Sequence, residues 1–182
     1  MNEDEIIQKN EIEDLNLSNN KLSLIQGPSV VEYLNLNALN LRNNKLERLP
    51  EELFCLQNLT KIDISQNLLK FIPERLCSCS TLEEINLNNN ELSVLPQQFE
   101  RLKKLKKLFL SKNCLKKLDK SIGNTGSLEI LDCSNNMIEG IEFSLNLPNL
   151  VYLCMSNNRI TFIARDSFFD LFKLKELNLS QN

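Results

Sequence analysis

Histidine is absent from the 182-residue sequence. Imidazole is the commonest general base, the usual activating partner of a nucleophilic Cys or Ser, and the most frequent metal ligand, so its absence removes most hydrolytic and metal-dependent chemistry. The phosphate-binding patterns G-x-x-x-x-G-K and G-x-G-x-x-G are missing, and the four glycines, at positions 27, 123, 126 and 140, are too dispersed to cradle a phosphate. Carboxylate pairs such as Glu83 and Glu84 are expected on a solvated face. The sequence therefore predicts no enzymatic activity, no metal site and no cofactor.

Long apolar runs and a strong excess of one charge are lacking too. No apolar stretch reaches the roughly 18 residues of a membrane-spanning helix. The N-terminal stretch "MNEDEIIQKNEIEDL" is acidic and has no apolar segment behind a basic start, unlike a secretory signal. A net charge of -3 argues against nucleic-acid binding by the whole surface. We expect no transmembrane segment and a cytoplasmic location, with the nucleus as the alternative.

One pattern fills most of the chain instead. The stretch "LEEINLNNNEL", residues 82–92, has leucine or isoleucine at its first, fourth, sixth and eleventh places and Asn90 at its ninth. The same frame recurs in "IEDLNLSNNKL", "LNALNLRNNKL", "LTKIDISQNLL", "LKKLFLSKNCL", "LEILDCSNNMI" and "LVYLCMSNNRI", and the incomplete copy "LKELNLSQN" closes the sequence. Steps of 22 to 24 residues between copies indicate a solenoid of stacked repeats. We expect an acidic segment or cap at residues 1–11 and eight repeats at residues 12–182, the last incomplete.

The middle of each copy alternates between apolar and polar residues, which predicts a short strand with one buried face. Every copy runs in the same direction, so neighbouring strands must be parallel and line one concave face of the stack. The ninth place is always asparagine, where the strand ends and backbone groups cannot reach a strand partner. An amide can both donate and accept, so we predict a structural role for this row, the Asn ladder. Its members are Asn20, Asn44, Asn67, Asn90, Asn113, Asn136, Asn158 and Asn182.

The return segments carry a second pattern. Pro50, Pro73 and Pro96 recur at intervals of 23 residues in "LERLPEEL", "LKFIPERL" and "LSVLPQQF", and the later copies lose this proline. Because proline cannot donate to a strand ladder, it belongs on the convex side. We expect short turns or single helical turns there, becoming less uniform where the proline is lost.

The six cysteines are scattered through the repeats and do not predict disulfides. Cys133 takes a core place of its repeat, and Cys79 aligns with Leu56 and Leu102, so both are expected to be small buried hydrophobic residues. The "CSC" at residues 77–79 lacks the second Cys pair or the histidines of a zinc site.

From about Ile12 to Asn182, these motifs resemble those of leucine-rich repeat proteins. The step of 23 residues with "LP" on the convex side is similar to the Ras-group subclass of intracellular scaffolds, which includes the Scribble and Erbin proteins and the Ras-associated repeat scaffolds. The resemblance implies an α/β solenoid, a horseshoe with a parallel sheet on its concave face. It also implies a signalling scaffold or adaptor that binds a protein partner, for which a small GTPase and a phosphatase complex are the candidates.

The concave strands are where a functional surface is expected, because their outward side chains have no role in the core. The first four repeats place mostly polar residues there, whereas the next three place several apolar ones. Such a patch with an aromatic anchor is typical of a binding hot spot, although a cap or neighbouring domain could cover it instead. The predicted partner-binding residues are Lys107, Phe109, Ile130, Asp132, Tyr152 and Cys154.

A basic band surrounds the fifth repeat, in which eight lysines lie between Lys103 and Lys120, next to Arg101. Such a band suits an acidic partner, anionic lipid or RNA, but a lysine run is more often a solvated face. Aromatic residues beyond Phe109 are not interleaved with it, so nucleic-acid binding is not the expected function.

The chain stops inside a repeat, which leaves Leu177 and Leu179 at an open end. Terminal repeats normally carry a polar cap, so we expect a fragment, a truncated product or association through this end. The alternative function is the targeting part of a larger enzyme of the deadenylase, cyclase or kinase type. A receptor ectodomain would show a signal peptide and cysteine-rich caps, and neither is present in this sequence.

Overall fold

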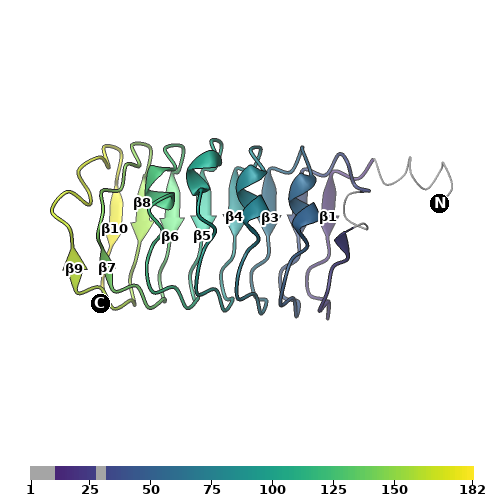
Figure 1. Ribbon diagram of the computed structural model, residues 1–182, viewed down its shortest axis with the longest axis horizontal. Helices are drawn as coiled ribbons and strands as arrows, with labels where there is room; N and C mark the ends of the chain where they lie inside the picture. The colour runs from purple at the N-terminus through teal and green to yellow at the C-terminus, as the bar shows by residue number, and fades with distance from the viewer. Residues whose placement is uncertain (1–10, 28–31) are drawn as a thin grey trace.

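The computed structural model describes residues 11–27 and 32–182, and these form an elongated stack of coils (Figure 1). The coils contribute one strand each to a parallel sheet whose order follows the chain. The predicted parallel-sheet solenoid is confirmed. Its strands in order are β1 (Asp14–Asn16), β2 (Ala38–Asn40), β3 (Lys61–Asp63), β4 (Glu84–Asn86), β5 (Lys107–Phe109), β6 (Ile130–Asp132), β8 (Tyr152–Cys154) and β10 (Glu176–Asn178).

The core is a set of columns in which equivalent residues of successive repeats stack. Register pairs each fourth-place residue with the next one, as in Leu39 with Ile62 and Ile62 with Ile85. The side chains at this place are at most 3 % exposed from β2 to β8, while their strand neighbours are largely half-buried or exposed. Burial of such columns is the main favourable term in folding, and each repeat buries them only against its neighbours.

Two cysteines complete these columns as predicted. Cys133 is fully buried and Cys79 is 4 % exposed. Burial, aided by the nearby Asp132, raises the pKa of the Cys133 thiol far above its usual range. Burial also raises the pKa of Cys77, to about 12, with the Glu74 and Glu100 carboxylates as further causes. These thiols therefore stay protonated at neutral pH and act as hydrophobic residues.

Single 3-10 turns cover the side opposite the sheet. They are η1 (Glu51–Cys55), η2 (Glu74–Ser78), η3 (Phe99–Arg101) and η4 (Ile122–Asn124). Pro50 and Pro73 directly precede η1 and η2, where a missing N–H and a fixed φ suit a helical start. The convex side then changes: β7 (Gly140–Ile141) and β9 (Phe162–Ile163) form a second, two-stranded parallel sheet.

The change occurs one repeat later than the loss of proline. η4 forms without proline because Asp119 takes over its local role: its Oδ1 accepts the Ser121 N–H at 2.8 Å, and its carbonyl accepts the Ile122 N–H. A side-chain acceptor before a turn satisfies backbone donors that would otherwise be free. The loss of "LP" alone therefore does not mark the end of the helical turns.

The Asn ladder connects each repeat to the one before it through side-chain amides. Asn90 Nδ2 donates to the Leu87 carbonyl of its own repeat and to the Ile64 carbonyl of the preceding repeat, both at 3.1 Å. Its Oδ1 accepts the Leu69 N–H, also from the preceding repeat, at 3.1 Å. Asn67, Asn113 and Asn136 repeat this set within 0.2 Å. One amide thus satisfies three backbone groups across two repeats.

The residue before each ladder asparagine has a left-handed backbone. These residues have φ between 52° and 59°, a region that Asn tolerates and most side chains avoid. Five of the eight are Asn, which explains the frequent "NN" pairs of the sequence. The full set is Asn19, Asn43, Gln66, Asn89, Lys112, Asn135, Asn157 and Gln181.

Apolar side chains are exposed at the last repeats. Leu177 is 44 % exposed and Leu179 is half-buried, and both Phe169 and Phe172 are about three-quarters exposed, at 77 % and 74 %. At the other end, all of the predicted acidic cap except Glu11 lies outside the described residues. Across the residues that are described, none of the helices has the length and apolar character needed to cross a membrane.

Replacing Asn90 by alanine tests the ladder. We expect the free energy of unfolding to fall by roughly 2 to 3 kcal/mol, because the buried Leu69 N–H loses its acceptor and two carbonyls each lose a donor. Chemical denaturation followed by circular dichroism measures the change. The matched control is Asn20→Ala: the Asn20 amide is exposed, and within the described part of the chain it donates to Leu17 and Ser18 of its own repeat. An equal loss in both variants would contradict the inter-repeat role.

Lys112 and Asn89 provide a reciprocal test of the left-handed position. Lys112→Asn should raise the free energy of unfolding by roughly 1 kcal/mol, and Asn89→Lys should lower it by a similar amount, because asparagine adopts this left-handed backbone at a lower cost than lysine does. Thermal unfolding of the two variants and their double exchange measures both effects. Shifts of the same sign in both single variants would refute the backbone explanation.

Candidate functional site

Six side chains on β5, β6 and β8 make up the predicted partner-binding patch. The sheet places them in two rows across neighbouring strands. In the first row Ile130 lies between Lys107 and Tyr152, and in the second Asp132 lies between Phe109 and Cys154. All except Cys154 are half-buried, so they offer part of their surface to solvent. We call the solvent-facing side of the eight-stranded sheet the sheet face.

The patch needs two corrections. Cys154 is only 5 % exposed, so it offers almost no area to a partner. Its sulfur is covered by polar neighbours: it lies 3.3 Å from Ser156 Oγ and interacts with the Tyr152 side chain. Phe109 is also not beside another apolar residue of its row, since Asp132 is its register partner. The apolar surface therefore consists of the adjacent pair Ile130 and Tyr152, with Phe109 placed diagonally.

Asp132 has a structural role that its position on the strand alone did not predict. Its Oδ1 accepts the Ser134 N–H at 2.9 Å, which closes the turn after the strand. Asn and Asp at the same fifth place do this in the other repeats, with distances of 2.9 to 3.1 Å. Such Asx turns explain why the fifth place is so often Asn or Asp. The repeated Asn or Asp at the fifth place was the feature of the sequence that could have predicted this role.

Phe109 and Cys154 are the exceptions to this capping row. Where Phe109 replaces the capping residue, Asn88 Oδ1 of the preceding repeat accepts the Ser111 N–H at 2.6 Å. The backbone donor is thus satisfied from another repeat, and an aromatic ring occupies a position that elsewhere holds a capping amide or carboxylate. Departures from a local rule that are compensated elsewhere are characteristic of functional positions.

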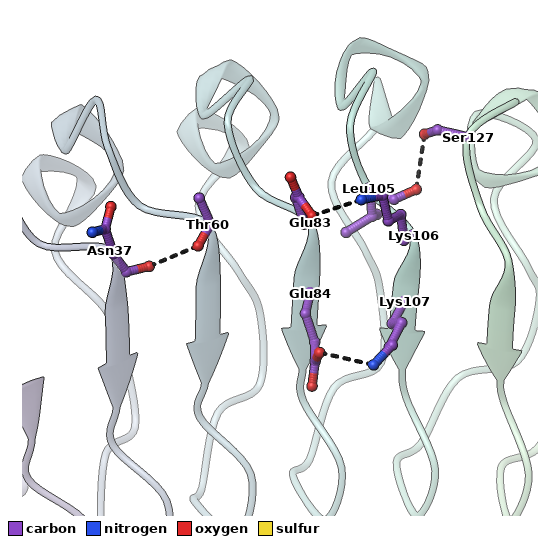
Figure 2. A network of polar contacts seen from close by, with 8 residues as sticks. All are labelled: Asn37, Thr60, Glu83, Glu84, Leu105, Lys106, Lys107 and Ser127. Atoms are coloured by element: carbon purple, nitrogen blue, oxygen red, sulfur yellow. Dashed lines mark hydrogen bonds and ion pairs between the residues drawn. The ribbon is translucent and has the colours of Figure 1, made fainter. Parts of the chain in front are cut away.

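Two ion pairs connect neighbouring repeats at β4 and β5, one on the strands and one directly before them (Figure 2). Lys107 Nζ lies 3.3 Å from Glu84 Oε2, and Lys106 Nζ lies 2.8 Å from Glu83 Oε2. The hydrogen bond and charge of Lys106 lower the pKa of Glu83, and Glu83 raises the pKa of Lys106 in return. Because these groups are solvated, the pairs add little stability, and they fix charge positions instead. Two lysines of the basic band are therefore already neutralised.

Three other lysines of the band lie on the convex side. Lys116, Lys117 and Lys120 line a groove with Val94 and Phe143. Asp119, Glu139 and Glu142 line the same groove, so its charges are mixed. The band thus surrounds the fifth repeat on several sides and does not form one continuous cationic face.

A recess on the sheet face lies over β1 to β4, away from the predicted patch. It measures about 240 Å³ and is lined by Asp14, Ala38, Lys61, Asp63 and Glu84, among others. From the sequence, this region was expected only to be polar. The signal was Ala38, a third-place residue much smaller than its register partners Asp14 and Lys61.

Tyr152 provides a pH-dependent test of the patch. Burial, contact with Cys154 and the charges of Asp132 and Glu176 raise its pKa to about 12. The folded state thus binds this proton more tightly than the unfolded state does, so stability is lost as pH rises from about 10 toward 12. Absorbance at 295 nm reports ionised tyrosine, so the wild type and Tyr152→Phe are titrated and their difference gives the Tyr152 signal. The midpoint of this difference should lie near pH 12. A midpoint near 10 would show an ordinary solvated phenol.

Models of known families match most of this chain. A model described as "Leucine rich repeat" matches residues 34–92 and 80–138, and one described as "Leucine Rich repeats (2 copies)" matches residues 126–171. A curated relative, "MAP kinase phosphatase with leucine-rich repeats protein 2" of Dictyostelium discoideum, is 40% identical over 65 residues. That match covers 35% of this chain and 9% of the relative, so the chain spans a small part of that protein.

Solved structures agree with the family match. One similar structure is the leucine-rich repeat ectodomain of the plant membrane receptor kinase GASSHO1/SCHENGEN3 from Arabidopsis thaliana, in complex with CASPARIAN STRIP INTEGRITY FACTOR 2. It superposes with a TM-score of 0.80 and 30% identity, over 92% of this chain and 21% of that one. The structure of a TLR13–ssRNA13 complex gives a TM-score of 0.82 and 27% identity, over 93% of this chain and 25% of that one. The repeat frame, the parallel sheet and these matches together show that the chain belongs to the leucine-rich repeat family.

Proposed function

We propose that this chain is a protein-interaction module that binds a partner on its sheet face, with Phe109, Ile130 and Tyr152 as the apolar centre. The observation that carries the proposal is the substitution of Phe109 for a capping residue, with Asn88 compensating from the preceding repeat. Core packing does not require this change, because the fifth place is outside the core column. Aromatic residues with partly exposed area and polar surroundings are typical interface anchors.

Lys107 and Asp132 belong to the rim of the same site. The Glu84 ion pair holds the Lys107 ammonium, and the Ser134 N–H holds the Asp132 carboxylate, so both charges are preorganised before a partner arrives. A polar rim around an apolar centre excludes water and fixes the orientation of the partner. Cys154 is buried next to Tyr152, with which its side chain interacts, and it is not itself a contact residue.

The cellular role that suits this site is a non-enzymatic scaffold or adaptor in a cytoplasmic signalling complex. A small GTPase or a phosphatase complex is the partner class implied by the resemblance to Ras-group scaffolds. A protein is favoured over nucleic acid because three carboxylates, Asp14, Asp63 and Glu84, line the sheet face over β1 to β4, where they would repel a phosphate backbone.

The targeting part of a larger enzyme is the second candidate function. The curated relative from Dictyostelium discoideum is named as a phosphatase, and the matched segment is 9% of its length. In this case the repeats would select the substrate and another domain would perform the chemistry. Immunoblotting of source cells with an antibody to the repeats decides between the two: a band near 21.0 kDa favours the stand-alone adaptor, and a much larger one favours the enzyme.

Charge placed in the patch should abolish partner binding. We expect Phe109→Asp and Tyr152→Asp each to weaken binding of a partner captured from source cells by about tenfold or more, the size of a hot-spot effect. Affinity capture with quantitative mass spectrometry identifies the partner, and calorimetry with purified protein measures the change. Circular dichroism verifies that each variant folds.

Val94→Asp is the matched control for these variants. Val94 is 60 % exposed and lies on the convex side, so the same type of change there should leave partner binding intact. Equal affinities for wild type, both patch variants and this control would refute the proposed site.

A further inference from the structure

The recess over β2 has a shape that fits one long side chain. Ala38 leaves a gap between Asp14 on β1 and Lys61 on β3, its register partners in the same row. The small Ala38 side chain forms the floor of the gap, because the Leu39 and Ile62 side chains, which also belong to its lining residues, are at most 3 % exposed and pack into the core. Asn16 and Asn40 contribute to a polar rim. Lysine and arginine combine an aliphatic stem with a charged head, which matches an apolar floor beneath a polar rim.

The charge of the recess favours a cation. Its lining holds three carboxylates, Asp14, Asp63 and Glu84, and one ammonium, Lys61. The Lys107 ammonium pairs with Glu84 from outside the lining, so the group carries three negative and two positive charges, a net charge of -1.

Asp14 is the carboxylate that can accept a new partner. Asp63 already accepts the Ser65 N–H at 2.9 Å and an Asn86 N–H at 3.2 Å. Glu84 is paired with Lys107. Asp14 is exposed, and among the described residues its side chain has no hydrogen bond or ion pair. An incoming ammonium or guanidinium would therefore gain a charge-assisted hydrogen bond at Asp14 without breaking an existing contact.

The recess and the apolar centre lie on one line across the sheet. Ala38 and Ile130 occupy the same third-place row, four strands apart from β2 to β6. With about 4.8 Å between strands, this separation is about 19 Å, which an extended segment spans with about six residues. A single stretch of partner chain can therefore reach both places.

We infer that the partner presents an extended segment in which a lysine or arginine enters the recess over Ala38, paired with Asp14, while an apolar side chain about six residues away packs on Ile130 and Tyr152. This inference rests on the proposed function, because it uses the same apolar centre. It adds the chemical class of the ligand, a basic and apolar segment with a fixed spacing.

The test is a selection of random linear 12-residue peptides displayed on phage against the purified 182-residue chain. Enriched peptides should share a Lys or Arg about six positions from a large apolar residue. A synthetic peptide of the enriched sequence should bind Asp14→Lys about tenfold more weakly by calorimetry, as expected for a lost charge pair. A second selection on Asp14→Lys should replace the basic residue with Asp or Glu and retain the apolar one.

Two further variants complete the design. Ala38→Gln fills the recess without changing its charge, so it should also weaken the peptide. Glu91→Lys is the matched control, because Glu91 is an exposed carboxylate after the strand and does not line the recess. It should leave the affinity unchanged. Circular dichroism of each variant separates lost binding from lost folding.

The outcomes distinguish this inference from the proposed function. Suppose that Tyr152→Asp abolishes peptide binding, but that the peptides carry no basic residue or bind Asp14→Lys as tightly as wild type. This result would refute the binding of a basic side chain in the recess and would leave the apolar centre supported. A selection that enriches only peptides insensitive to both variants, or none at all, would overturn both. If Glu91→Lys weakens peptide binding as much as Asp14→Lys does, the effect comes from the overall charge of the protein. This result would also refute the binding of a basic side chain in the recess.

Discussion

The side-chain amide of the ladder asparagine is the interaction on which the rest of this structure depends. Each coil turns inward directly after its strand, so backbone donors and acceptors at the turn are buried without a strand partner. Asn90 accepts one N–H and donates to two carbonyls, and two of these three groups belong to the preceding repeat. Because the repeats contact only their neighbours, this bond set transmits stability along the stack. The leucine columns supply most of the apolar burial, and the amides fix where each column ends.

The sheet face is available for function because the turn is satisfied internally. The fifth-place Asn or Asp caps the seventh-place N–H, so most of that row is committed to the backbone. The third-place row is free to vary, and it carries Ala38, the Glu84–Lys107 pair, Ile130 and Tyr152. Phe109 joins them only because Asn88 replaces its cap. The proposed binding surface therefore consists of positions at which the otherwise uniform repeat pattern is broken.

The leucine period and the invariant asparagine were enough to predict the parallel strands and their register, because both follow from local spacing. Burial of Cys154 was not predictable in this way, since alternation alone places the fifth place outward, and the contacts of its sulfur with Tyr152 and Ser156 depend on the side-chain arrangement. The role of Asp132 was missed because a carboxylate on a strand suggests solvent, and its bond to the Ser134 N–H depends on the turn geometry. The recess over Ala38 is a property of three adjacent strands, so no single repeat reveals it.

Native-state hydrogen exchange measured by NMR tests the central role of the ladder most directly. The N–H groups of Leu46, Leu69, Leu92 and Leu115 each bond to an asparagine side chain of the following repeat. The ladder predicts that they exchange as slowly as the Leu41, Ile64 and Leu87 N–H groups, which bond to backbone carbonyls of the next strand. Exchange of the first set at the rate of solvent-exposed amides, with the second set still protected, would contradict the account.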